Sequence, residues 1–458
     1  MLDRSHIHLA TLFATVLVFT QGTEASFQKT RQVSVEALIY DLKHPDGDRR
    51  KEAARILGEH RIRKAVPALI ELTHDPDHQI RRQAVGALVR INDPRALPAY
   101  IRLTQDFHRS IQEKSIEGIV TLYVVEEGGF VQGVRKVVDF VNPLSDDYNP
   151  LMVEPYVAVD PTAVDALAKL LGDPRSRTRK QAATALGILR AYSALDAIQS
   201  RLAQEEKDGV KVELIRAIYK IGDPGAGKAV LPLTRDSDKK VHDEAIYTLG
   251  RLRVTEAVPT LSELYGAGIE ERRKVFGLIP VSGSDDLQKR LFEALAHIGD
   301  PASKSLFFNA LADGREFNRR YAAEGLGRVG DSDVLDQVAR AYVREKSRSA
   351  KLAMSFALYR LGRQEHLEEL VRSAGGDQGH GYLLEFSPAE TEKLYPYLRS
   401  EKNSTRVRLL DVIGLRGGAS AIPVVEELTA SKSAEVVSAA NLAIRRLQGR
   451  HRQRESTQ

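Results

Sequence analysis

A two-helix phrase recurs along this chain, and its recurrence restricts the fold more than any other feature. It is clearest between residues 238 and 264, where apolar residues keep helical spacing on both sides of a break at residues 253–256. A related phrase begins at Arg81. The unit is therefore a helix, a tight turn and a second helix, and it is a repeat rather than a domain.

The residue in the middle of each first helix marks the period and is called the anchor. Within each run the anchors follow one another in steps of 31 or 32 residues, and gaps of 67, 46 and 55 residues between runs indicate degenerate copies or insertions. One repeat cannot bury its own apolar stripe, so a period in this range predicts a solenoid. We expect an all-α fold, an α-solenoid of stacked helix pairs with a period of about 31 residues. The anchors are Ala53, Ala84, Ser115, Ala182, Leu214, Ala245, Leu291, Ala322, Met354, Leu409 and Ala440.

Three short phrases within the repeats indicate their type. A basic residue precedes Ala-Ala-x-x-Leu-Gly at residues 179–187 and 319–327, an acidic turn stands at residues 299–301, and Ala-Val-Pro-x-Leu stands at residues 65–69. The chain has no Trp and lacks the ankyrin and tetratricopeptide phrases. It resembles the HEAT-repeat family, in the short bacterial form also found in bilin lyases, over roughly residues 33 to 450. The resemblance implies a HEAT-like superhelix and, for most of this family, a binding scaffold.

The absence of cysteine and the mixing of charges exclude several classes of function. With no Cys, the chain has no disulfide, no thiolate metal site, no thiol nucleophile and no bilin attached to its own cysteine. Its formal net charge is +5, and acids and bases are interspersed, as at residues 270–274. Nucleic-acid binding by counterion release requires one sign of charge gathered on a surface. We therefore expect no nucleic-acid partner.

The first 25 residues do not follow the repeat. Arg4 precedes an apolar run from Leu9 to Phe19, and small residues near Ala25 fit a signal-peptidase site, so we predict a secretory signal peptide at residues 1–25. The run is too short for a stable membrane span. The rest divides into N-terminal repeats at 33–125, an irregular insertion at 126–161, C-terminal repeats at 162–450 and a basic, disordered tail at 451–458.

The insertion carries the residues most open to a partner. Residues 142–161 contain four prolines and no helical period, and a long irregular segment inside a repeat array is typically a binding loop or a linker. Its apolar side chains need cover, either from the flank of the array itself or from another molecule. We predict packing on the chain's own flank, with a candidate partner-binding loop as the alternative. The loop residues are Asp146, Asp147, Tyr148, Met152 and Tyr156.

Two motifs fit a chemical role by spacing but not by context. Residues 222–228 match the Gly-x-x-x-x-Gly-Lys of a phosphate loop, but they follow a predicted helix instead of a strand and precede Ala229 instead of Ser or Thr. His74 and His78 have the spacing of metal ligands, yet Pro76 indicates that the helix starts between them. We therefore predict no catalytic residue, no cofactor and no metal site.

Two glycine-containing stretches predict irregular structure between repeats. Residues 373–382 are rich in glycine, which permits positive φ and close approach of the backbone. They predict a flexible connection within a degenerate repeat, with a small-anion loop as the alternative. Residues 266–285 are predicted to hold a short helix between two loops.

We expect a non-enzymatic HEAT-repeat scaffold that mediates protein–protein interaction in the bacterial cell envelope, in the periplasm or as a secreted protein. Its concave face, lined by the second helices, would take a protein or an extended peptide. A bilin lyase-like or chromophore-handling protein is the alternative function that the resemblance implies. A cytoplasmic or N-terminally anchored chain is the alternative location.

Overall fold

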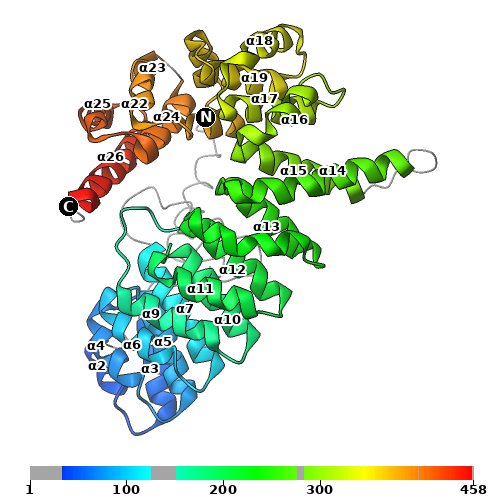
Figure 1. Ribbon diagram of the computed structural model, residues 1–458. Coiled ribbons are helices and arrows are strands. Elements are labelled where there is room, and N and C mark those ends of the chain that lie inside the picture. Colours follow the sequence, from blue (N-terminus) through cyan, green and yellow to red (C-terminus); the bar gives the residue numbers. More distant parts are fainter. Residues whose placement is uncertain (1–33, 125–150, 276–282, 401, 456–458) are drawn as a thin grey trace, which may run out of the picture. The chain divides into compact units, whose positions relative to one another are not determined.

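The computed structural model describes residues 34–124, 151–275, 283–400 and 402–455, and every regular element in these ranges is a helix (Figure 1). The predicted all-α fold of paired helices is confirmed. The chain divides after Gly118 into two compact units, both of which are built from the same kind of helix pair. The domain boundaries expected near residues 125 and 161 stay predictions.

Within the described ranges, eleven helices carry one predicted anchor each, and we call them the anchor helices. No anchor is more than 2% exposed, so the period in the sequence locates the core correctly. The anchor helices are α3 (Gly47–Glu59), α5 (His78–Ile91), α7 (Arg109–Val124), α10 (Ser176–Ile188), α12 (Asp208–Ile221), α13 (Lys239–Arg251), α15 (Gly283–Ile298), α17 (Glu316–Val329), α19 (Arg348–Arg360), α24 (Asn403–Arg416) and α26 (Ala434–Glu455).

Apart from the short helix at residues 377–383 and the short 3₁₀ turns, the other helices are called partner helices, and most of them pack against the anchor helix that follows in the chain. Together the two sets bury each repeat's apolar stripe between neighbours, as a solenoid requires. The partner helices are α2 (Val35–Asp41), α4 (Val66–Leu72), α6 (Leu97–Leu103), α9 (Pro161–Lys169), α11 (Leu195–Gln204), the 3₁₀ stretch η5 (Gly225–Arg235), α14 (Val258–Val275), α16 (Lys304–Ala310), α18 (Leu335–Arg344), α20 (Leu367–Arg372), α22 (Pro388–Thr391), α23 (Tyr397–Ser400) and α25 (Ile422–Glu426).

Proline and aspartate define the turns of the repeat. Pro67 and Pro98 lie in the first turn of α4 and α6, where a missing N–H costs no hydrogen bond. Asp46 caps α3. The cap of α5 is Asp77 and not Asp75. The Asp75 carboxylate instead accepts a hydrogen bond from the backbone N–H of Asp77.

Neighbouring anchor helices approach closely because a glycine of one faces an alanine of the next. A Cβ added to Gly187 would lie 2.9 Å from the Cα of Ala217, and a Cβ on Gly327 would lie 2.8 Å from the Cα of Ala357. A backbone atom at that distance cannot move aside alone, so any larger residue must push the two helices apart. The glycine of the repeat phrase is therefore a packing requirement. The same contact joins Gly58 to Ala87, Gly250 to Ala294 and Gly414 to Ala443.

The basic residue of the repeat phrase, three positions before the anchor, joins its own turn to the next repeat. Arg179 donates from Nη1 to two carbonyl oxygens of the turn before α10 and from Nε to Glu205 of the next repeat, at 2.8 Å. Arg319 likewise donates from Nη1 to two carbonyl oxygens of the turn before α17 and from Nε to Glu345, at 2.6 Å. The equivalent ion pairs are Arg50 with Asp75, Arg81 with Asp106, and Lys211 with Asp236.

These ion pairs make stability depend on pH. The Arg319 guanidinium lowers the pKa of Glu345 from its ordinary 4.5 to about 2. Because the folded-state pKa lies below the unfolded one, this stabilisation is complete above pH 4.5 and is lost as the pH falls toward 2. We expect the urea midpoint, followed by circular dichroism from about pH 6 to about pH 3, to fall less steeply in Glu345→Gln than in the unaltered chain. Equal slopes for the two would contradict this, and Glu316→Gln, on the exposed start of α17, is the control.

Parts of two stretches expected to be irregular are helical, and there the predictions were wrong. Residues 377–383 form α21 (Asp377–Leu383) after a turn at residues 373–376, and α14 continues without a loop at residues 266–268. Residues 276–282, where the second of the two loops was expected, lie outside the described residues. Distant partners hold α21 in place: Gln378 donates to the carbonyl of Ser349, and the Tyr382 hydroxyl donates to Glu324. Glycine content describes only local preference, which these tertiary contacts override.

An ionic cluster, made of Arg253, Glu324, Arg328, Tyr382 and Glu385 and buried except at Arg253, joins the end of α13, helix α17 and the end of α21, and we call it the buried ionic cluster. Arg328 donates to Glu385 at 2.8 Å and to Glu324 at 3.2 Å, and Arg253 donates to Glu385 at 2.5 Å. The side chains of Arg328 and Glu324 are 3% and 1% exposed. Burial alone would raise the pKa of Glu385, but Arg328 and Arg253 bring it to about 2. Each charged group of the cluster is therefore stabilised by an opposite charge beside it.

Candidate binding surface

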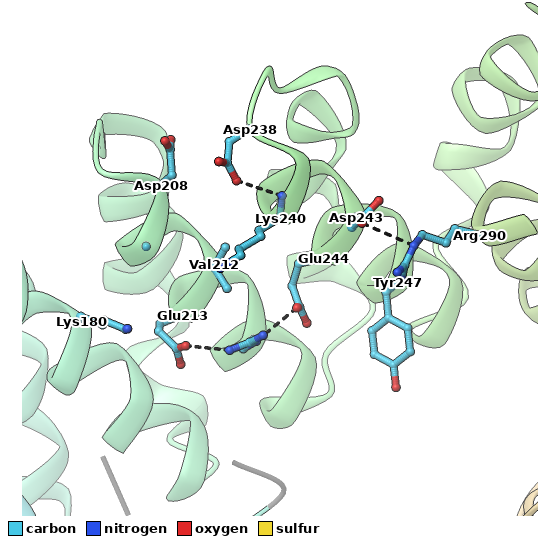
Figure 2. Close-up of a pocket in the computed structure, with 12 residues that line it drawn as sticks. Lys180, Asp208, Val212, Glu213, Asp238, Lys240, Asp243, Glu244, Tyr247 and Arg290 are labelled. Carbon is cyan, nitrogen blue, oxygen red and sulfur yellow. Dashed lines mark hydrogen bonds and ion pairs between the residues drawn. The ribbon is translucent and has the colours of Figure 1, made fainter. Parts of the chain in front are cut away.

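A pocket of about 760 Å³ lies on the solvent side of α10, α12, α13 and α15, and we call it the charged groove (Figure 2). It therefore lies on the anchor helices, whereas we expected the binding face on the second helices. It is lined by Lys180, Asp208, Gly209, Val212, Glu213, Arg216, Asp238, Lys240, Asp243, Glu244, Tyr247 and Arg290.

Helical spacing brings these side chains to one side. On α13 the groove residues begin at Lys240 and recur at intervals of three and four positions up to Tyr247, which places them on one face of the helix. The opposite face carries Val241, Ala245 and Leu249, which are fully buried. The groove is thus the polar side of the same amphipathic helix whose apolar side forms the core.

A chain of alternating charges crosses the groove from α12 to α13. Arg216 donates to Glu213 at 2.9 Å and to Glu244 at 3.1 Å, and the Thr184 hydroxyl donates to Glu213 at 3.0 Å. Burial raises the pKa of the Glu244 carboxyl, although Arg216 acts in the opposite direction. Figure 2 shows Glu213 and Glu244 joined in this way through one guanidinium. Most of these charges are therefore already compensated within the protein.

The rim of the groove offers charges that are less fully compensated. The Asp243 carboxylate forms ion pairs with the ammonium group of Lys239 at 2.8 Å and with the guanidinium of Arg290 at 3.4 Å. Figure 2 shows the second of these pairs. Asp208 is exposed, and within the described ranges its one ion-pair partner is Lys211, at 3.4 Å. Lys240 is exposed, and among the described residues its ammonium group has no ion-pair partner. The rim can therefore form new ion pairs with a partner that presents both signs of charge.

The groove presents both signs of charge. The lining has five carboxylates, four cations, one Tyr and one Val, so neither sign dominates. In the part of the chain that the structure describes, no three His, Asp or Glu side chains are placed to hold a metal ion. His74 lies in the turn before α5 and His78 is the first residue of that helix, so the predicted helix start between them is confirmed.

The predicted partner-binding loop is described only in part. Asp146, Asp147 and Tyr148 lie outside the described residues. Met152 is 46% exposed. A Cβ on Gly449 of α26 would lie 2.1 Å from the Cβ of Tyr156, so this tyrosine is packed tightly on the chain's own helix.

Neighbouring residues of the same segment fasten it to α10 and α12. The Val153 N–H donates to the carbonyl of Ile188 at 2.9 Å, and Lys220 donates to the carbonyl of Leu151 at 3.3 Å. Burial lowers the pKa of Lys220 to about 8. Residues 151–156 therefore pack on the flank of the array, and a role for the segment in binding a partner stays a prediction.

The phosphate-loop match at residues 222–228 is a helix end, as its context predicted. Gly222 ends α12 with φ of 84°, a left-handed conformation that favours glycine. The Asp223 carboxylate then accepts from the N–H of Gly225, and Lys228 pairs with Glu256 at 2.7 Å. The lysine that would contact a phosphate is thus engaged with the next repeat.

The groove residues escaped notice in the sequence because each is an ordinary surface charge. Asp208, Glu213 and Lys240 belong to no motif, and their proximity follows only from the stacking of α12 on α13. Aligning the repeats on their anchors would have shown which charged positions share a face. Within the described helices, none combines the length and apolar character needed to cross a membrane.

Comparison with known proteins identifies the repeats. Residues 35–119, 158–218 and 195–275 match the family model of HEAT repeats. No curated protein matches the chain.

Similar solved structures include an engineered protein, with TM-score 0.42, 18% identity, and coverage of 90% of this chain and 98% of that one. Importin beta has TM-score 0.42, 13% identity, and coverage of 90% and 62%. The complex of CpcE and CpcF of phycocyanin lyase from Nostoc sp. PCC7120 has TM-score 0.25, 17% identity, and coverage of 73% and 96%. These similarities carry no argument about function.

Proposed function

We propose that this chain of HEAT repeats is a non-enzymatic scaffold that binds a protein, or an extended peptide segment of one, in the charged groove. The observation that supports this most directly is the rim of the groove, where Lys240 has no ion-pair partner among the described residues and exposed Asp208 has a long one, Lys211 at 3.4 Å. A partner that alternates acids and bases can pair with both. The groove spans several repeats, so many shallow contacts can add up along an extended segment.

The proposal predicts that binding depends on where the charges stand and not on their sum. In the variant Asp208→Lys with Lys240→Glu, the rim charges are exchanged while the net charge is unchanged. We expect the affinity for a protein partner to fall about tenfold or more, because attractive pairs become repulsive ones. The partner would be captured with the full chain from an envelope extract, purified, and titrated by calorimetry against each variant.

The matched control exchanges another exposed pair on the partner helices. Arg235 and Glu263, on η5 and α14, pair at 2.7 Å with side chains 52% and 67% exposed. Arg235→Glu with Glu263→Arg should leave the affinity within about twofold, since the two exchanged residues can still form an ion pair and lie away from the groove. The proposal fails if the unaltered chain holds no protein, or if both exchanges weaken binding equally.

The scaffold is proposed to act outside the cytoplasm. The apolar run from Leu9 to Phe19 and the small residues near Ala25 support this, and they lie outside the described residues. The intact mass of the chain recovered from the cell envelope should correspond to a product that has lost about 25 residues. A full-length mass in the cytosolic fraction alone would contradict export.

A further inference from the structure

A second pocket, of about 470 Å³, lies between the successive partner helices α16 and α18, and we call it the cationic cleft. Its floor is apolar: Leu311 and Met354 are 6% and 1% exposed, and Phe308 stands beside them at 41%. A partly exposed aromatic ring over a buried aliphatic floor offers contact to an apolar side chain from outside.

Positive charge surrounds this floor. The cleft is lined by Arg319, Arg340, Arg344 and Lys346 and by one carboxylate, Glu345. That carboxylate is already engaged, because Arg319 donates to both of its oxygens at 2.6 and 3.0 Å. The side chains of Arg340, Arg344 and Lys346 are exposed and have no ion-pair partner within the described part of the chain. Three positive charges therefore remain open at the rim.

Three repeats carry a side-chain bridge at the position where the cleft opens, and they show what differs at the cleft. Two positions are compared around each anchor: the residue ten positions before it and the residue eighteen positions after it. In these repeats the two side chains contact each other between neighbouring partner helices. Around the anchor Ala245 these are Arg235 and Glu263, which pair at 2.7 Å.

Other repeats close the same crossing in a similar way. Around Leu409 the two residues are Arg399 and Glu427, paired at 2.8 Å, and around Ala84 they are His74 and Arg102, hydrogen-bonded at 2.6 Å. Around Ala322 the two positions hold Ala312 and Arg340. The bridge is thus absent at this repeat, and its remaining guanidinium faces the cleft.

One further group points to the kind of ligand. Gln337 lines the cleft, and its side-chain Oε1 is buried without a hydrogen-bond partner. A buried amide oxygen of this kind is satisfied by an N–H donor, and its amide nitrogen by an acceptor. A peptide backbone carries both, whereas a fatty acyl chain carries neither.

We propose that the cationic cleft binds an extended acidic peptide segment with at least one large apolar side chain. The apolar side chain lies on Phe308, Leu311 and Met354, carboxylates of the segment pair with Arg340 and its neighbours, and a backbone amide meets Gln337. Arginine suits this task because its planar guanidinium binds carboxylates bidentately. The cleft lies on the partner helices and needs nothing from the charged groove, so either site can fail without the other.

The test uses the full chain and a defined probe, the fluorescein-labelled peptide Glu-Asp-Leu-Glu-Phe-Asp-Leu. Fluorescence anisotropy should show saturable binding that weakens as salt rises. Replacing the probe's acids by their amides, or its Leu and Phe by Ser, should each weaken binding about tenfold or more. If only the acids matter, the site is a nonspecific cationic patch and the proposal is wrong.

Variants of the chain locate the binding. Arg340→Glu should weaken probe binding about tenfold, whereas Lys51→Glu, the same change at an exposed lysine of α3, should leave it within about twofold. Ala312→Arg with Arg340→Glu rebuilds the bridge seen at Arg235 and Glu263, so it should also abolish binding while keeping the fold.

Two outcomes overturn the proposal. One is equal loss of binding in Arg340→Glu and Lys51→Glu. The other is Arg340-dependent binding to vesicles of phosphatidylserine without binding of the peptide, which would assign the cleft to an anionic lipid surface instead.

Discussion

Glu324→Ala should lower the free energy of unfolding by about 3–5 kcal/mol, the largest loss that we expect from any single substitution in this chain. The carboxylate is almost inaccessible to water and compensates two guanidinium groups: Arg328 donates to it at 3.2 Å and Arg320 at 3.0 Å. It also accepts the Tyr382 hydroxyl at 2.6 Å. Its removal leaves buried Arg328 with Glu385 alone and Arg320 without this carboxylate, and the buried positive charge that is then only partly compensated costs more than the lost contacts themselves.

The measurement is urea unfolding followed by circular dichroism, with Glu316→Ala as the control. Glu316 lies on the same helix, α17, but is exposed, so its replacement should change the free energy of unfolding by less than about 1 kcal/mol. A similar small change for Glu324→Ala would show that the buried ionic cluster does not hold α13, α17 and α21 together.

Gly327→Ala should destabilise the chain by about 1–3 kcal/mol even though alanine is the better helix former. The added Cβ would lie 2.8 Å from the Cα of Ala357, so α17 and α19 must separate. Gly381→Ala, inside α21, is the matched control because a Cβ there meets nothing within 4 Å. That variant should be more stable, by up to about 1 kcal/mol, since only helix propensity changes.

The opposite signs make the comparison decisive. Urea midpoints of the two glycine variants, measured side by side, should shift in opposite directions. If both glycines tolerate alanine equally, the close glycine–alanine contact between anchor helices is not what sets their spacing, and the explanation of the repeat phrase fails.

The regular part of the fold was predictable because it is encoded locally and repeated. The anchors, the prolines of α4 and α6, and the glycine of the repeat phrase recur at a fixed period, so each copy supports the others. Asp75 shows where this reasoning stops. It looks like a helix cap, but its carboxylate pairs with Arg50 at 2.8 Å, one repeat earlier, and Asp77 caps the helix instead.

The irregular parts depend on partners that are far away in the sequence. The sequence predicted a flexible connection where α21 lies. The contact that holds α21 joins Tyr382 to Glu324, 58 positions earlier, so nothing close to α21 in the sequence indicates it. The Arg253 pair with Glu385 spans 132 positions. No local pattern reports such contacts, since they arise only from the way successive repeats stack.

The two candidate sites were hidden for a related reason. Both consist of common surface charges, and what distinguishes them is the absence of an internal partner, as at Lys240 and Arg340. Compensation between repeats becomes visible only when their equivalent positions are compared. Charged positions that lack the bridge found in other repeats are therefore the best sequence-level signal for a binding surface in this chain.

The central claim, that each repeat is held mainly by its neighbours, is tested most directly by hydrogen exchange on the Gly327→Ala chain, resolved helix by helix. The account predicts faster amide exchange in α17 and α19, the two helices forced apart, and unchanged protection in α10 and α12. An equal loss of protection in all four helices, or none in α17 and α19, would contradict it.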